Sequence, residues 1–270
     1  MNFRYNLLII TLILGSLQVF SQDEKIFYNN GIFWNKNEFA QFFEDKPYGI
    51  GLDVIHRRGT TFENNNPLER HLRTSVRPWF HYQFSPDARL SVSPIGYFST
   101  NEYEAMPFDV GRPSSFELRS TIQFFHHHKQ MAGKIMHTWR YRLEFRNRQT
   151  EGSDEFVNFA RFRFRYRFRY IINAPDFYTQ GMWYTNVSCE IGLNMGAPVV
   201  YNTFNQNRIY FGVGKRIFNS ARLELRYVDR VRTRGTGYEF DRGRGVMLAL
   251  NVDQISILGR KYTQPVRYAD

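Results

Sequence analysis

Between residues 159 and 172 the chain reads FARFRFRYRFRYII, in which arginine and aromatic residues alternate one by one. Arginines occupy the odd positions from Arg161 to Arg169, and aromatic residues occupy the even positions from Phe162 to Tyr170. A helix with 3.6 residues per turn would scatter both sets around its circumference, whereas a β-strand places them on opposite faces. The stretch is therefore predicted to be a strand with one arginine face and one aromatic face.

This predicted strand is long enough to cross an outer membrane. From Arg161 to Arg169 it spans roughly 27 Å at about 3.4 Å per residue, close to the roughly 25 Å apolar band of an outer-membrane barrel. A water-soluble sheet could instead bury the aromatic face in a core and leave the arginines in water. The neighbouring segments decide between these interpretations, because every strand of a membrane barrel alternates in the same way.

Ten further segments show a similar alternation, which makes eleven candidate strands with the central one. The eleven candidate strands are residues 31–43, 48–58, 71–84, 89–100, 116–124, 139–146, 159–172, 186–194, 208–214, 222–227 and 246–253. Short breaks such as Asn219-Ser220 alternate with longer polar ones such as 101–114. Such an asymmetry of short turns and long loops is typical of an outer-membrane barrel.

We therefore predict an all-β protein, a transmembrane antiparallel up-and-down β-barrel with short periplasmic turns and longer outer loops. Single-chain bacterial barrels have even strand numbers, so we expect ten or twelve strands instead of eleven. Either residues 31–43 do not pair, or one terminal strand escapes the pattern. The barrel is expected to occupy residues 22–253, followed by a C-terminal tail, 254–270, without a clear period.

The N-terminus has the form of a cleavable signal peptide, residues 1–21. One early charge, Arg4, precedes an apolar run from Leu7 to Leu14, and Val19 and Ser21 suit cleavage after residue 21. The alternative, an uncleaved membrane anchor, is disfavoured because the run is shorter than the roughly 20 residues that a spanning helix needs. We expect export and an outer-membrane location.

The composition supports this interpretation. The formal charge is +11 and 17 % of the residues are aromatic, yet the mean hydropathy is only −0.50. Membrane barrels combine these features because polar lumen residues offset apolar lipid-facing ones. A soluble protein this basic would suggest nucleic acid as a partner, but export argues against it. The single cysteine, Cys189, excludes an intramolecular disulfide and a cysteine-cluster metal site.

The arginine faces are the strongest chemical signal. In a barrel they would point into one lumen, where they outnumber the glutamates of the same faces. The candidate lumen-lining binding residues are Arg140, Arg142, Glu144, Arg161, Arg163, Arg165, Arg167, Arg169, Glu190, Arg208, Glu224 and Arg226. They could pack the lumen as cross-strand ion pairs, or form an anion-selective passage or a site for an acidic ligand. Since an unpaired buried charge is costly, we expect a lumen that is either wet or lined by Arg–Glu pairs.

Other candidate chemistry is weaker. His126 and His128 would share one strand face and could hold a metal ion with a carboxylate, but a polar strand end is the simpler interpretation. Serines occur at positions 91, 93, 114, 115 and 120, without a G-x-S-x-G motif. The pattern thus identifies no catalytic residue, metal site or cofactor. The expected partners are outer-membrane lipid and small anionic solutes.

Four segments carry a resemblance to a known family. HTWRYRLEFRNR (137–148), ARFRFRYRFRY (160–170), FNQNRIYFGVG (204–214) and LELRYV (223–228) resemble the domain-of-unknown-function 2490 family, a group of exported proteins found mainly in Gram-negative bacteria. The resemblance extends over residues 30–253 and is specific in the second half. It implies an outer-membrane β-barrel of unassigned activity, and it brings no catalytic residues.

Three functions are consistent with these observations. The first is an outer-membrane barrel without enzyme activity, in a structural role or as an anion or small-solute passage. The second is an outer-membrane barrel enzyme that acts on lipid or lipopolysaccharide, which needs a serine or a carboxylate beside a histidine near the rim. The third is a secreted β-sandwich that binds anionic polysaccharide, which would bury the aromatic face of the central strand.

Overall fold

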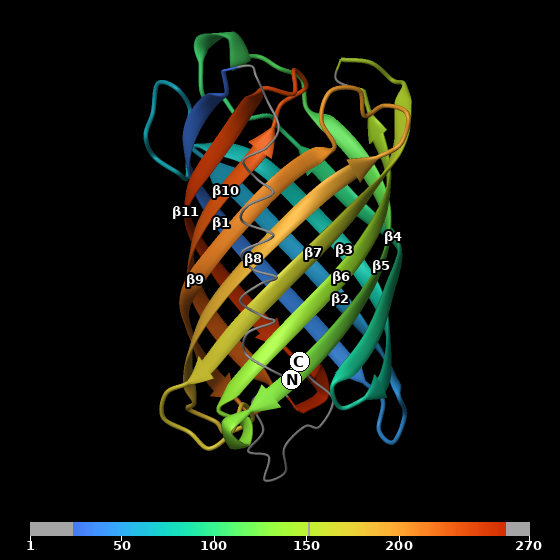
Figure 1. The fold of residues 1–270 in the computed structure, drawn as a ribbon, viewed down its shortest axis with the longest axis vertical. Helices are drawn as coiled ribbons and strands as arrows, with labels where there is room; N and C mark the ends of the chain where they lie inside the picture. Colours follow the sequence, from blue (N-terminus) through green and yellow to red (C-terminus); the bar gives the residue numbers. More distant parts are fainter. Residues whose placement is uncertain (1–23, 151, 258–270) are drawn as a thin grey trace.

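The computed structural model describes residues 24–150 and 152–257, which form one closed β-barrel (Figure 1). Its strands are β1 (Ile26–Phe42), β2 (Tyr48–Gly59), β3 (Arg70–Ser85), β4 (Ala88–Thr100), β5 (Ser115–Gln130), β6 (Ile135–Gln149), β7 (Phe156–Ile171), β8 (Trp183–Met195), β9 (Phe204–Phe218), β10 (Ala221–Thr233) and β11 (Glu239–Val252). Short 3₁₀ turns lie at Pro107–Asp109, Met131–Gly133 and Ile255–Ile257. The predicted signal peptide lies outside the described residues, as does most of the predicted tail.

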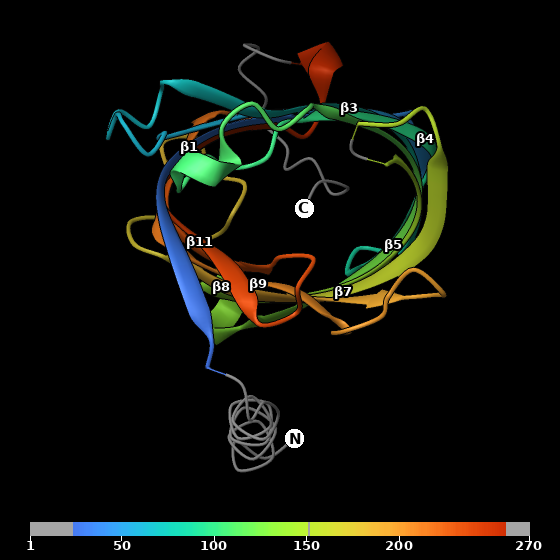
Figure 2. The same cartoon turned by 90° about the horizontal axis from the view of Figure 1, so that it is seen from above.

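Each strand pairs with its neighbours in sequence, and the sheet closes between β1 and β11 (Figure 2). These two strands run parallel, with Ile26 opposite Glu239 and Phe39 opposite Val252, whereas β1 and β2 are antiparallel like the other sequential pairs. In an up-and-down sheet with an odd number of strands the first and last strands point the same way, so the closing pair has to be parallel. The described barrel thus has eleven strands instead of the expected ten or twelve, and it is not antiparallel throughout.

The wall of the barrel has the two faces that the alternation predicts. All five arginines of β7 are buried, with exposed fractions of 2–9 %. The aromatic side chains between them are more exposed, up to 40 % for Tyr170, and outward residues on neighbouring strands such as Phe145 and Val187 reach about half exposure. Because these apolar side chains cover the outside of a single closed sheet, the sandwich alternative is excluded. Among the described residues, no helix combines the length and apolarity needed to span a bilayer.

The two ends of the barrel differ in their connections. The end where β1 begins, here called the long-loop end, carries the segments 60–69, 101–114, 150–155, 196–203 and 234–238 and lies at the top of Figure 1. The opposite, short-turn end carries connections as brief as Pro86-Asp87 and Asn219-Ser220, together with one longer loop, 172–182. This is the predicted asymmetry of short turns and long loops.

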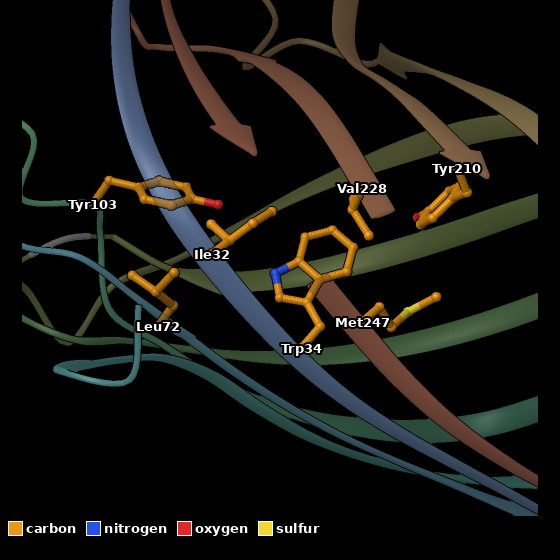
Figure 3. Close-up of a cluster of buried hydrophobic side chains, with 7 residues drawn as sticks. All are labelled: Ile32, Trp34, Leu72, Tyr103, Tyr210, Val228 and Met247. Atoms are coloured by element: carbon orange, nitrogen blue, oxygen red, sulfur yellow. The ribbon is translucent and has the colours of Figure 1, made fainter. Parts of the chain in front are cut away.

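A loop folds inward at each end. At the long-loop end, Tyr103 of the β4–β5 loop lies beside Ile32 and Leu72 in a buried cluster (Figure 3). The other members of this cluster are Trp34, Tyr210, Val228 and Met247. At the short-turn end, Phe177 and Met182 of the β7–β8 loop join a second buried cluster with Met136, Ile171 and Tyr184. Both mouths of the barrel are therefore narrowed by apolar packing.

The parallel closure can be tested by crosslinking. Asn35 on β1 faces Leu248 on β11, and paired strand positions suit the roughly 4.4–6.8 Å Cα separation of a disulfide. In a Cys189→Ser background, Asn35→Cys with Leu248→Cys should therefore crosslink and alter the mobility of the unreduced, denatured chain on a gel. Asn35→Cys with Leu225→Cys, one strand further away, is the control. Crosslinking of the control pair in preference to the Asn35–Leu248 pair would contradict the observed closure.

Candidate functional site

All twelve residues predicted to line the lumen are buried. They come from five consecutive strands, β6 to β10. Their side chains reach residues of distant strands, as in the 3.9 Å ion pair between Glu144 of β6 and Arg77 of β3. Only side chains that point into the barrel can make such contacts, so the predicted face is the lumen face. The role of these residues in binding remains a prediction.

Glu144 is the centre of the largest ion-pair cluster in the lumen. It is completely buried, and five guanidinium groups lie 2.5–3.9 Å from its carboxylate. They belong to Arg161, Arg163, Arg119, Arg142 and Arg77. Arg119, Arg161 and Arg163 donate charge-assisted hydrogen bonds to this carboxylate, whereas Arg142 and Arg77 are close enough for electrostatic attraction alone. One carboxylate thus compensates several positive charges at once.

Glu190 forms a second centre, and Arg163 links it to the first. Arg163 donates to both Glu144 and Glu190. Glu190 also pairs with Arg140 and, at 3.2 Å, with Arg208. Two smaller groups lie in the same lumen. Glu117 accepts from Arg119 and Arg146, and Glu224 pairs with Arg226. The centre of the lumen is therefore lined by Arg–Glu pairs, one of the two expected arrangements.

Not every predicted residue belongs to this network. Arg165 and Arg167 form no ion pair with any described residue, although both are buried. Arg169 lies 3.0 Å from the sulfur of Met136 and places its guanidinium over the ring of Phe177. At Arg165 and Arg167 the lumen therefore carries positive charge that no carboxylate among the described residues pairs.

The alternating pattern gives no indication of the acidic side chains at the long-loop end. Glu102 and Asp109 lie in the segment 101–114, which shows no period, yet both are buried. Glu102 binds Arg148 and Arg232, at 2.9 and 2.5 Å, and Asp109 binds Arg234 at 2.9 Å. The one signal in the sequence is complementary charge, since this acidic loop has its counterpart in the basic run of residues 230–234.

A cavity of about 480 Å³, here called the vestibule, occupies the long-loop end. Seven arginines and no acidic residue line it among the described residues: Arg73, Arg146, Arg148, Arg161, Arg230, Arg232 and Arg234. A second cavity of about 450 Å³ shares Arg148, Arg232 and Arg234 with it. The central void below measures only about 50 Å³. The lumen is thus open at one end and filled with side chains at its centre.

A serine–histidine contact of the kind that the enzyme alternative requires is present, but it is buried. Nδ1 of His81 lies 2.8 Å from Oγ of Ser91 near the short-turn end. Ser91 is completely buried, and neither residue lines any of the three cavities. The other contacts of His81 include stacking against Phe42 and Trp79. We therefore interpret this contact as a structural hydrogen bond between two buried side chains.

The histidine run does not form a metal site. His126 and His128 lie on the exposed outer face of β5, where His126 stacks on Trp139 and His128 lies beside His137. Within the described part of the chain, no group of three histidine, cysteine, aspartate or glutamate side chains is arranged to hold a metal ion. The interpretation as a polar, aromatic-flanked strand end fits this geometry.

One family model matches the chain, over residues 31–240, and its description is "Protein of unknown function (DUF2490)". The match begins within β1 and ends at the start of β11. It therefore includes every residue of the Glu144 and Glu190 clusters as well as the β4–β5 loop. Comparison with curated proteins and with solved structures found no match.

The first prediction from this site concerns Glu144. Replacement by glutamine removes the shared partner of five buried arginines, so Glu144→Gln should lower the free energy of unfolding by about 3–5 kcal/mol. Urea unfolding of the protein refolded in lipid vesicles measures this change. Glu155→Gln, the same substitution in the exposed β6–β7 loop, is the control and should have no measurable effect. Equal stabilities of the two variants would show that the cluster is not the main compensation of the lumen charge.

The second prediction concerns pH and the β4–β5 loop. Burial by itself would raise the pKa of Glu102, but Arg232 and Arg148 outweigh it and hold the pKa well below its ordinary value. Because the folded-state pKa is depressed, this carboxylate stabilises the docked loop fully above pH about 4.3 and loses that effect as the pH falls further. A spin label at the exposed position Val110 should therefore become more mobile between pH 7 and pH 3.

The matched variant is Glu102→Gln, measured with the same label. It lacks the titrating group, so its loop should already be more mobile at pH 7 and should respond less to acid. Labelling requires Val110→Cys in the Cys189→Ser background. Identical mobility of both proteins at both pH values would contradict the role of Glu102 in docking the loop.

Proposed function

The chain belongs to the DUF2490 family of proteins of unknown function, and on the basis of its own structure we propose that it is an outer-membrane β-barrel whose arginine-rich lumen binds small anions. The observation that carries this proposal is the vestibule, whose described lining contains seven arginines and no acidic residue. Five of these arginines are paired with carboxylates beside the cavity, whereas Arg73 and Arg230 form no ion pair with a described residue and leave the recess with excess positive charge. Such a concentration of positive charge in a recess attracts anions from solution and favours their binding.

The outer wall supports the membrane part of the proposal. Phe80, Phe211 and Leu225 are each more than half exposed, on three different strands of the wall. A continuous apolar surface of this kind is rare on soluble monomers, which seldom expose patches above a few hundred Å². Lipid is the environment in which such a wall is stable, and closure of the sheet leaves no unpaired strand edge in that environment. The expected signal peptide provides the route for export.

The interior favours binding over free passage. The central void of about 50 Å³ is only large enough for a few water molecules. At the short-turn end, Phe177 and Met182 are almost completely buried within the barrel mouth. An anion that enters the vestibule therefore meets a closed floor, and passage would require the ion-pair network to rearrange. The Arg–Glu clusters have a structural role in this proposal, since they fill and crosslink the lumen.

The assignment of the two faces is tested by a pair of variants on β7. Phe164 belongs to the outward face and Arg165 is buried in the lumen without an ion pair. Phe164→Arg should block stable insertion, because a charge facing lipid at the midplane costs roughly 2–4 kcal/mol. Arg165→Gln should leave insertion intact. Folding into lipid vesicles, followed by the mobility of unheated protein on gels, distinguishes the two outcomes.

The membrane location is tested in cells by fractionation. The wild-type protein should fractionate with outer membranes and resist extraction by carbonate or urea. Recovery in the soluble periplasm would overturn the membrane location. Failure of Arg165→Gln to fold while Phe164→Arg folds normally would show that the faces are assigned the wrong way round.

A further inference from the structure

Three lumen arginines near the vestibule have no carboxylate partner. They are Arg57 on β2, Arg73 on β3 and Arg230 on β10, and none forms an ion pair with a described residue, whereas most lumen arginines do. Arg57 and Arg230 are 8 % and 6 % exposed. A guanidinium buried to this extent without a negative partner is unfavourable. A negatively charged group beside these side chains would therefore stabilise them.

The contacts of these arginines leave donors unused. The guanidinium of Arg57 lies 4.1 Å from the centre of the Trp34 ring. Arg73 donates to the hydroxyl of Thr100 at 2.9 Å, and Arg230 donates to the hydroxyl of Tyr103 at 3.0 Å. The Nε atoms of Arg57 and Arg230 are buried and have no hydrogen-bond partner among the described residues. Aromatic rings favour a cation but accept no strong hydrogen bond, so the described protein groups leave part of the hydrogen-bonding capacity of these guanidinium groups unused.

The three arginines meet where the vestibule ends. Arg73 lines both the vestibule and the central void, Arg230 lines the vestibule, and Arg57 lines the central void. The charges of Arg57, Arg119 and Arg230 act on Arg73 against the attraction of the carboxylate of Glu117, and the charges of Arg208 and Arg230 act on Arg57. The three groups therefore repel one another across the floor of the vestibule, at a place that a solute from the long-loop end can approach.

We propose that Arg57, Arg73 and Arg230 form a binding site for a phosphate dianion, either free or as the terminal group of a phosphate monoester. This proposal rests on the proposed function of the lumen as an anion-binding site and names its ligand class. A dianion compensates two of the three charges, and its oxygens accept several guanidinium hydrogen bonds at once. A monocarboxylate or a halide compensates only one charge and therefore binds more weakly.

The vestibule above these arginines can hold the remainder of a monoester. Its lining includes the amides of Asn194, Asn202 and Asn205 and the rings of Phe159 and Tyr201. Amide side chains donate to and accept from hydroxyl groups, and a cavity of about 480 Å³ falls in the size range of small-molecule sites. A phosphorylated sugar with its phosphate on the floor matches this arrangement of charge below and amides above.

The test compares Arg73→Gln and Arg230→Gln with the wild type, and Arg244→Gln as a charge-matched control. Arg244 lies on the outer wall, half exposed, 3.6 Å from Asp229. Calorimetry in detergent micelles measures binding of inorganic phosphate, glucose 6-phosphate, chloride and acetate. Each lumen variant should bind both phosphate compounds at least about tenfold more weakly, since each loses charge-assisted hydrogen bonds to the ligand. The control should bind like the wild type.

A thermal readout separates binding from a merely structural role. Without phosphate, both lumen variants should melt at the wild-type temperature or above it, because each removes repulsion among the three arginines. With phosphate, the melting temperature should rise for the wild type and the control and much less for the lumen variants. Lower melting temperatures of both lumen variants in the absence of phosphate would overturn the proposal, since they would mark these arginines as structural supports.

Further comparisons of the four anions distinguish the phosphate site from the more general proposal that the lumen binds anions. Tighter binding of glucose 6-phosphate than of phosphate, weakened by Asn205→Ala, supports the monoester, and the reverse order supports free phosphate. Equal binding of phosphate, chloride and acetate, unaffected by the lumen variants, overturns the phosphate site and leaves an anion-binding lumen. Binding of none of the four anions by the wild-type protein overturns the proposed function itself.

Discussion

The structure depends on one constraint, that more arginines than carboxylates are enclosed in a closed sheet. A buried guanidinium without a negative partner is costly, and the penalty is largest where water is excluded. The barrel meets this constraint by sharing, since the carboxylate of Glu144 contacts five guanidinium groups and Arg163 joins it to Glu190. Removal of one shared carboxylate therefore affects several strands at once. The stability of the centre of the lumen thus depends on a few acidic residues.

The loops take part in this compensation. The β4–β5 loop brings Glu102 and Asp109 to the arginines of the long-loop end and anchors itself through Tyr103 in the apolar cluster of Figure 3. At the short-turn end, the β7–β8 loop contributes no comparable acid, and Phe177 instead offers its ring to Arg169 and its carbonyl to Arg216. Apolar packing narrows both mouths of the barrel, and the β4–β5 loop adds ion pairs at the long-loop end.

The same imbalance connects the fold to the proposed function. Arg–Glu pairs fill and crosslink the centre of the lumen, whereas Arg57, Arg73 and Arg230, which line the central void or the vestibule, form no ion pair with a described residue. The positive charge that destabilises the empty site is the charge that a dianion would compensate. A barrel with an apolar outer wall and a cationic recess at its long-loop end is thus suited to hold anions at a membrane surface, in a lumen closed below.

The alternation along the chain is a local property, and it determined most of the wall. Because successive side chains of a strand point to opposite faces, the residues from Arg161 to Arg169 had to share one face wherever β7 was placed, and all eleven alternating segments are strands. Closure, register and the paths of loops depend on residues far apart in sequence. For that reason only the tertiary structure decided the parallel pairing of β1 with β11, the meeting of Arg77 with Glu144 across three strands, and the docking of Glu102 on Arg232. The sequence by itself determined which face of each strand points into the lumen, and the three-dimensional closure of the sheet decided which loop residues join it and which arginines find a partner there.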